Sequence, residues 1–212
     1  MVLSWVKSLA EFLGEELHLA WLEVDEPDLM TVLRALSENH TSIVIQPLLL
    51  FASGHAQVDV PQIVDAFHEQ CPNVKVKVMP CLGMREILLA SWKEMLSKRV
   101  IEGRDLWLLG RGSKTVEVIS LFDSLHGELE QHLAVKVGVL YSGLQQPGLE
   151  ETREEISQSR APLLIPCLLF DGLLLDRCRG VEGLEIAPVL SEIPLFNEMV
   201  CRHVKSGLSQ LV

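Results

Sequence analysis

The 212-residue sequence has no long apolar run and comparatively few basic residues. No stretch approaches the roughly 18 apolar residues that a membrane-spanning helix needs, so we expect no membrane span. The N-terminal residues lack a basic region followed by an apolar core and a cleavage site, so we expect no signal peptide and a cytoplasmic location. The net charge of −11 disfavours nucleic acid and anionic membranes as partners.

The sequence also lacks the motifs of common cofactor sites. It contains neither a GxxxxGK[ST] loop nor a GxGxxG turn after a strand, so we expect no nucleotide and no organic cofactor. The five cysteines include no CxxC pair, which argues against a zinc ribbon or an iron–sulfur cluster. We expect reduced thiols in the core at Cys71, Cys81, Cys167, Cys178 and Cys201.

The sequence does contain a regular alternation of apolar runs and segments with helical periodicity. Its hydrophobic content of 48% is enough for one sizeable core or two small ones. Strands are predicted at 19–23, 42–48, 74–78, 105–109, 135–140, 162–167 and 184–187. The segments between them include a predicted helix over 87–96, so the pattern indicates an α/β fold of parallel sheets with crossover helices.

The two halves of the chain repeat each other weakly. The matching segments occur in the same order, and each pair contains a proline: 26–29 with 146–149, 44–51 with 163–170, and 78–82 with 186–190. We therefore predict a duplication, with an N-terminal repeat over 1–102 and a C-terminal repeat over 103–212. The alternative is a chance similarity between two α/β units.

The most informative segment is 51–61, Phe-Ala-Ser-Gly-His-Ala-Gln-Val-Asp-Val-Pro, which follows the predicted strand 42–48. Asp59 is predicted to cap the next helix, with Pro61 in its first turn. His55 is then expected on a glycine-flanked loop at the carboxyl end of a parallel strand, where open α/β sheets bind ligands. Gly54 is expected to allow a tight turn beside it.

The repeat has two asymmetries. Residues 170–176 have leucine where the histidine would stand, so His55 has no counterpart in the second half. The second half opens with a strand and turn, 106–113, whose counterpart in the matched register would lie before Met1. We therefore expect that the chain starts inside its first helix, through truncation or a misplaced start, and that the first sheet lacks one strand.

These features resemble the CbiX-type sirohydrochlorin chelatases, the class II tetrapyrrole metallochelatases. The resemblance rests on residues 47–61 and 78–83 in the first half. Residues 110–113 and 170–177 resemble the degenerate second repeat of the long, two-domain members. The resemblance implies two similar lobes, each a mostly parallel sheet flanked by helices, with a cleft between them. It also implies a lyase-type enzyme that inserts a divalent metal into a metal-free tetrapyrrole.

The substrates implied by this family are a sirohydrochlorin-like tetrapyrrole and a divalent metal ion, with cobalt expected first, iron second, and nickel also suitable. The pathway would be cobalamin or sirohaem biosynthesis, and the chain would act as a monomer or homodimer. One alternative is a non-catalytic relative that binds tetrapyrrole or metal. Another is an α/β interaction domain in which the histidine is incidental.

The family usually works with two histidines, of which one matches His55. In the family the other lies in a His-Gly-Ser turn after the first strand, a position that would precede Met1 here. The second-half version of that turn carries Arg111 in place of the histidine. Metal insertion displaces two pyrrolic N–H protons, and imidazole can both hold a divalent ion and accept protons near neutral pH. His55 is therefore predicted to be a metal ligand and catalytic proton acceptor; the alternative is a solvated loop histidine.

The other predicted site residues surround this histidine or carry positive charge. Glu23 ends the strand 19–23, where the family commonly has an acid, and is predicted to be a second metal ligand and catalytic residue. Arg111 is predicted to reach a substrate carboxylate. Ser53 and Gly54 are predicted to contact the substrate. The alternatives are a solvated carboxylate, a surface charge and residues that only shape the loop.

Overall fold

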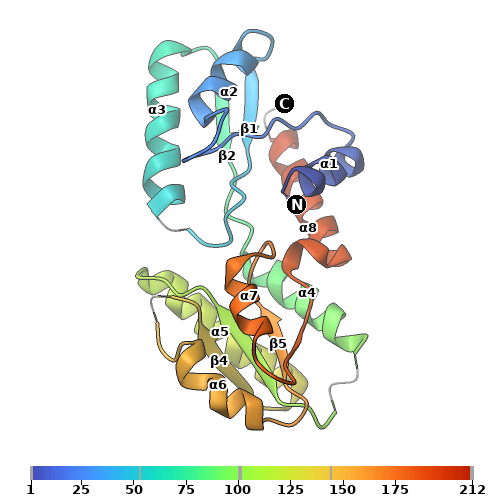
Figure 1. The fold of residues 1–212 in the computed structure, drawn as a ribbon. Coiled ribbons are helices and arrows are strands. Elements are labelled where there is room, and N and C mark those ends of the chain that lie inside the picture. Colours follow the sequence, from blue (N-terminus) through green and yellow to red (C-terminus); the bar gives the residue numbers. More distant parts are fainter. Residues whose placement is uncertain (1, 53, 100–101, 144, 211–212) are drawn as a thin grey trace. The chain divides into compact units, whose positions relative to one another are not determined.

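The computed structural model describes residues 2–52, 54–99, 102–143 and 145–210, which form two compact units (Figure 1). Unit 1 consists of Met1–Met84 and Glu198–Val212, and unit 2 of Arg85–Asn197. Both contain parallel strands and helices, which confirms the predicted α/β class. The units divide the chain at other points than the predicted repeats, so the repeat boundary near residue 102 stays a prediction.

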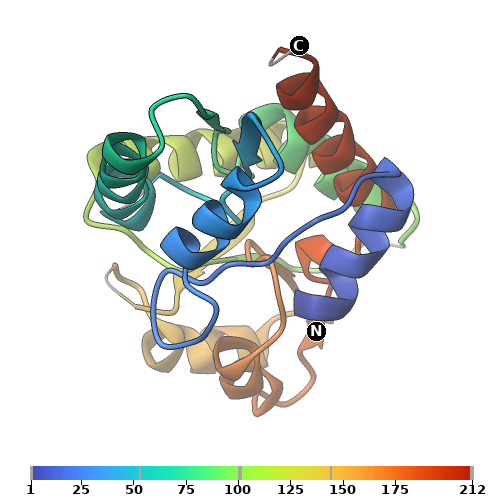
Figure 2. The ribbon, with the colours of Figure 1, turned by 90° about the horizontal axis from the view of Figure 1, so that it is seen from above.

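Unit 1 is built on a two-stranded parallel sheet of β1 (Ser42–Ile45) and β2 (Lys75–Val78). Its helical elements are α1 (Val2–Leu13), α2 (Leu29–Ser37), the π-helical turn η1 (His55–Asp59), α3 (Val60–Gln70) and, from Glu198 onward, α8 (Pro194–Ser209). Apolar residues of α2 and α3, such as Leu33 and Phe67, pack on Ile43 of β1. Figures 1 and 2 both show α1 beside α8, where Lys205 lies over the Phe12 ring.

Unit 2 has a four-stranded parallel sheet in the order β4-β3-β5-β6. Its strands are β3 (Leu106–Gly110), β4 (Val137–Tyr141), β5 (Leu163–Pro166) and β6 (Glu185–Ile186), and its helices are α4 (Arg85–Ser97), α5 (Val116–Leu133), α6 (Leu149–Gln158), α7 (Leu173–Arg179) and the 3-10 turn η2 (Leu190–Glu192). Every residue of β3 and β5 is buried. Such continuous apolar strands are typical of a parallel sheet covered on both faces.

The matched segments of the two halves form the same backbone hydrogen bonds. Met79 N–H donates to Ile45 O at 2.8 Å, and its counterpart Ala187 N–H donates to Leu164 O at 2.8 Å. The bond from Trp21 N–H to Pro27 O, at 3.0 Å, likewise corresponds to the bond from Tyr141 N–H to Pro147 O, at 2.9 Å. The matched segments thus have the same local backbone geometry, and the duplication itself stays a prediction.

The predicted strand at 19–23 is wrong. Only an isolated bridge between Trp21 and Asp28 forms there, whereas the matching segment in unit 2 is the full strand β4. The physical reason is the partner: β4 pairs along its length with β3, and unit 1 has no counterpart of β3 among its described residues. The other predicted strands are present with shorter or slightly shifted ends, and the predicted helix 87–96 lies within α4.

The cysteines are all free thiols. Cys167, Cys178 and Cys201 are buried as predicted, whereas Cys71 and Cys81 are half-buried. Burial raises the pKa of the Cys167 thiol to about 12, so this side chain behaves as an apolar core group. None of the described helices has the length and apolar character required to cross a membrane.

Candidate functional site

The histidine singled out by the sequence lies on a helical turn rather than on a loop. His55 is the first residue of η1, and Val60 N–H donates to His55 O, the i to i+5 bond of a π-helix. Asp59 was predicted to cap the following helix, and this prediction is wrong. Its backbone is already helical and its side chain caps nothing, because the helical path starts earlier, at His55.

The Asp59 carboxylate contacts His55 instead. The Nδ1 atom of His55 lies 2.7 Å from Oδ2 of Asp59 and 4.0 Å from Oε1 of Glu23. The structure therefore brings together the two predicted residues, His55 and Glu23, and adds Asp59. The three side chains are between 42% and 66% exposed, so solvent and ligands can reach them.

Asp59 was missed as a site residue because its place before Pro61 favoured a capping role. The spacing between His55 and Asp59 is i, i+4, which places two side chains on one face of a helical turn. That spacing would have found the contact only if the turn had been expected to be helical.

A shallow pocket of about 430 Å³ adjoins these carboxylates. Its lining combines the segment that carries Glu23 with the start of α3: Leu22, Glu23, Met30, Asp59, Gln62, Ile63 and Ala66. The lining thus combines apolar side chains with two carboxylates. An aromatic ring and a cation can both be accommodated by such a lining.

Gly54 does not have the predicted backbone conformation. Gly54 has φ −43° and ψ −51°, a backbone conformation that any residue adopts, and a Cβ atom there would meet nothing within 4 Å. The predicted tight turn at Gly54 is therefore wrong, while its predicted contact with substrate stays a prediction. Ser53 lies outside the described residues.

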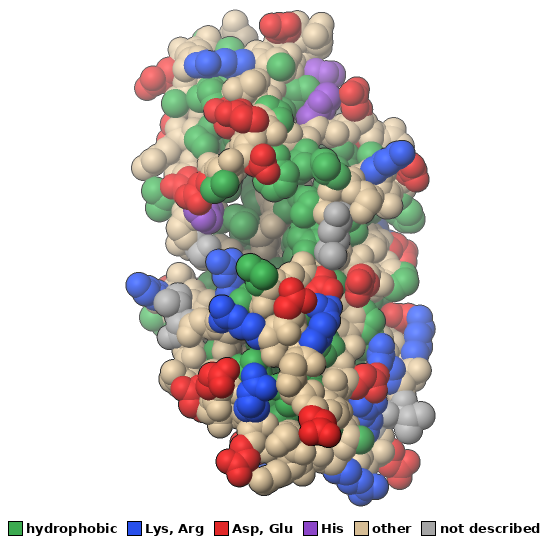
Figure 3. All heavy atoms as spheres, viewed as in Figure 1, with side chains coloured by type: hydrophobic (Ala, Val, Ile, Leu, Met, Phe, Trp, Pro, Cys, Tyr) green, Lys and Arg blue, Asp and Glu red, His purple; other side chains and the backbone are tan. Residues whose placement is uncertain are grey.

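Arg111 follows β3 in unit 2 and is exposed. Lys114, three residues later, is exposed as well, and α5 starts just beyond it. Neither side chain forms an ion pair with a residue that the structure describes. Figure 3 shows several lysine and arginine side chains on the viewed face of unit 2. The role of Arg111 toward a substrate carboxylate stays a prediction.

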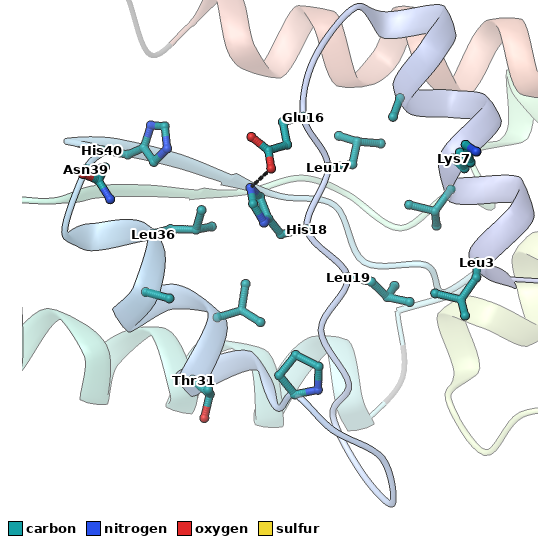
Figure 4. Close-up of a pocket in the computed structure, with 15 residues that line it drawn as sticks. Leu3, Lys7, Glu16, Leu17, His18, Leu19, Thr31, Leu36, Asn39 and His40 are labelled. Atoms are coloured by element: carbon teal, nitrogen blue, oxygen red, sulfur yellow. Dashed lines mark ion pairs between the residues drawn. The ribbon is translucent and has the colours of Figure 1, made fainter.

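A larger pocket of about 820 Å³ in unit 1 contains none of the predicted site residues (Figure 4). It lies between α1, α2 and the segment 16–19, and most of its lining is apolar. Its histidines are exposed, and His18 Nε2 lies 3.6 Å from Glu16 Oε1. We therefore place the candidate site at His55.

The other six histidines differ in exposure. Three are exposed, namely His18, His40 and His132, while His68, His126 and His203 are half-buried. Burial, the largest cause, lowers the pKa of His203. In the described residues, no three His, Cys, Asp or Glu side chains are grouped so that they could hold a metal ion.

Comparison with known proteins gives a family match over the first part of the chain. Residues 1–99, which include Glu23, His55 and Asp59, match the CbiX family. The resemblance to the CbiX-type chelatases is confirmed. The chain is also 26% identical to the sirohydrochlorin ferrochelatase of Bacillus subtilis (strain 168), over 79% of this chain and 67% of that relative. It is 25% identical to the sirohydrochlorin ferrochelatase of Priestia megaterium, over 76% and 64%.

The similarity to chelatases extends to the fold. The matches span about two thirds of the length of these two curated relatives. SirB from Bacillus subtilis with Fe³⁺ superposes with a TM-score of 0.80 at 20% identity, covering 96% of this chain and 87% of SirB. The cobalt complex of SirB from Bacillus subtilis subspecies spizizenii gives a TM-score of 0.72 at 18% identity, with 95% and 87% covered. Both show that the chain has the chelatase fold.

Proposed function

We propose that the protein is a sirohydrochlorin chelatase, which inserts divalent cobalt or iron into a metal-free tetrapyrrole. The observation that carries the proposal is the placement of His55 beside two carboxylates within the CbiX-matched part of the chain. Two relatives are named sirohydrochlorin ferrochelatases, and the similar SirB structures hold Fe³⁺ in one case and cobalt in the other. We rank cobalt before iron as the metal and keep nickel as a third candidate.

The reaction is a proton-for-metal exchange. The macrocycle binds one divalent ion and releases two pyrrolic N–H protons, with no change in oxidation state. His55 holds the incoming ion as a neutral imidazole and accepts a proton as the metal leaves it for the macrocycle. Glu23 provides a nearby carboxylate that assists metal delivery or takes the second proton, and water carries both protons away.

Substrate binding has to overcome the negative charge of the chain. A sirohydrochlorin-like tetrapyrrole carries several carboxylates, and the protein has a net charge of −11. We propose that Arg111 pairs with one substrate carboxylate, since its side chain is exposed. Ser53 and Gly54, which precede His55, are proposed to contact the macrocycle.

The test is a multiple-turnover assay with the full chain. Metal-free sirohydrochlorin is mixed anaerobically with cobalt, iron or nickel, with and without protein, and metal insertion is followed by absorbance. A rate above the uncatalysed one that scales with protein concentration is the expected result, and the relative rates rank the metals. Equal rates with and without protein would contradict the proposal. Tetrapyrrole binding measured in parallel would then identify a non-catalytic relative.

A further inference from the structure

We propose that Asp59 is a positioning residue, which fixes the tautomer of His55 so that Nε2 is the nitrogen that meets metal and protons. This inference rests on the proposed function of His55. Its basis is the 2.7 Å contact between Nδ1 of His55 and Oδ2 of Asp59. Because Asp59 caps no helix, its carboxylate is available for this contact.

The chemistry of the two groups decides which nitrogen carries the proton. An ionised carboxylate only accepts hydrogen bonds, and a neutral imidazole has one N–H and one lone pair. The short contact therefore places the imidazole proton on Nδ1, donated to Asp59, and leaves the lone pair on Nε2. Among the described residues, none forms a hydrogen bond or ion pair with Nε2. A carboxylate that orients a metal-binding imidazole in this way is a common arrangement.

The π-helical turn makes the contact possible. The wider turn spans His55 to Asp59 and closes with the bond from Val60 N–H to His55 O, so both side chains are held by one short piece of backbone. Helical turns with this bond are rare and occur often at functional sites. The contact that orients the His55 ring is thus made within a single helical turn.

Glu23 lies on the same edge of the ring. Its Oε1 is 4.0 Å from Nδ1, a distance at which two groups attract but do not form a hydrogen bond. Glu23 is also the obvious replacement acceptor if Asp59 is removed, so the test includes both residues.

Unit 2 lacks the pair as a whole. After its matched strand the chain continues through Gly172 into α7, whose first residue is Leu173, and the residue at i+4 is Arg177. An arginine has no acceptor atom and would have nothing to orient at Leu173. The loss of both partners in one unit is consistent with residues that act together.

The test uses the full chain labelled with ¹⁵N-histidine and kept free of metal. Long-range ¹H–¹⁵N spectra at pH 8 distinguish the two neutral tautomers, and the signals of His55 among the seven histidines are assigned with His55→Gln. We expect Nδ1 to carry the proton in the wild type. In Asp59→Asn, where the amide can donate to Nδ1, we expect a shift toward the Nε2–H tautomer and an about 10- to 100-fold weaker affinity for cobalt ions.

Three further variants make the result interpretable. Asp59→Glu should retain part of the wild-type Nδ1–H population and cobalt affinity. The double variant Asp59→Asn with Glu23→Gln should show a larger tautomer shift and a larger loss of affinity than Asp59→Asn alone. Asp65→Asn makes the same charge change at an exposed position of α3 and should change neither the tautomer of His55 nor the affinity for cobalt ions. Unchanged backbone spectra establish that each variant is folded.

A proton on Nε2 in the wild type, or an unchanged tautomer and affinity in both Asp59→Asn and the double variant, would overturn the inference. Failure of the chelatase proposal would look different. The insertion assay would show no catalysis while the tautomer and its dependence on Asp59 remained as described.

Discussion

Unit 1 and unit 2 share matched strands and hydrogen bonds, but they differ in the side chains that follow the matched strands. In unit 1 the chain after β1 leads through Gly54 to His55, which contacts Asp59 and lies near Glu23. In unit 2 the chain after β5 leads through Gly172 to Leu173, and the position that matches Glu23 is Gly143. Among the described residues, the group of His55, Asp59 and Glu23 therefore has no counterpart in unit 2.

The sheets of the two units differ in the number of strands and in their burial. Within the described residues, β1 pairs only with β2, while its counterpart β5 lies between β3 and β6. Leu164 of β5 is 0% exposed, and its counterpart Ile45 is half-buried. The unit that carries the candidate chemistry thus has the smaller sheet, and the other unit has the sheet with two fully buried strands, β3 and β5.

The largest expected effect is on the stability of unit 2. Leu164→Ala leaves a cavity between strands and helices and should cost about 2–5 kcal/mol of unfolding free energy. Ile45→Ala in unit 1 should cost less, about 1–2 kcal/mol, because its side chain already contacts solvent. Native-state hydrogen exchange, which reports the opening of each unit separately, measures both. Equal losses of unfolding free energy in the two variants would contradict the difference in burial between Leu164 and Ile45.

Glu23→Gln tests whether the carboxylate that unit 2 lacks contributes to the chemistry. The change removes a charge near His55 with little change in shape, and we expect an about tenfold slower metal insertion. Asp25→Asn is the control, since it changes the same charge on the same exposed segment. An equal loss of insertion rate in both variants would show that Glu23 acts only as a general surface charge.

A smaller effect is expected from replacing a glycine by alanine in each unit, at Gly54 and at Gly138. Gly54→Ala should leave the stability of unit 1 unchanged or raise it by up to about 1 kcal/mol, because Gly54 has a helical backbone with open space around it. Gly138→Ala should destabilise unit 2, since its Cβ would lie 2.5 Å from Cε3 of Trp107. Thermal unfolding of both variants checks this, and a destabilised Gly54→Ala would contradict the assigned conformation.

The smallest effect concerns an edge-strand ion pair in unit 2. The Glu185 carboxylate accepts hydrogen bonds from the guanidinium groups of Arg104 and Arg99. The hydrogen bond from Arg104 is the largest cause of the lowered pKa of the Glu185 carboxyl. Glu185→Gln should cost less than about 1 kcal/mol at pH 7, because the side chain is 47% exposed and the pair is screened.

The sign of its pH dependence follows from the lowered pKa. A carboxylate with a lowered pKa in the folded state stabilises the protein above its ordinary value of about 4.3, and this contribution is lost as the pH falls through the lowered value. Unfolding of wild type and Glu185→Gln from pH 7 downward should therefore show curves that converge in acid. A constant difference would contradict the ion pair.

Much of the fold follows from local sequence patterns. The apolar runs of β3 and β5 predict strands because both faces of a covered parallel strand are apolar. The segment 19–23 has the same local character and fails to form a strand. Pairing depends on a neighbouring strand, and no local pattern reports whether that neighbour is present.

The site shows the same limit. His55 is predicted from its position after a strand and Glu23 from its position at the end of one, both together with the family resemblance. The structure places His55 Nδ1 4.0 Å from Glu23 Oε1. Asp59 was assigned to the wrong role, because a π-helical turn has no sequence signature that distinguishes it from a loop before a capped helix. Residue types and strand ends are readable from sequence, whereas a rare turn that redirects one carboxylate is not.

The most direct test of the chemistry in unit 1 is the single-turnover rate of cobalt insertion with protein in excess over sirohydrochlorin. His55→Ala is compared with Leu173→Ala, which removes the side chain at the matched and 80% exposed position of unit 2. We expect Leu173→Ala to keep the wild-type rate and His55→Ala to fall by at least about 100-fold while it still binds tetrapyrrole. A His55→Ala variant that inserts cobalt at the wild-type rate would contradict the account.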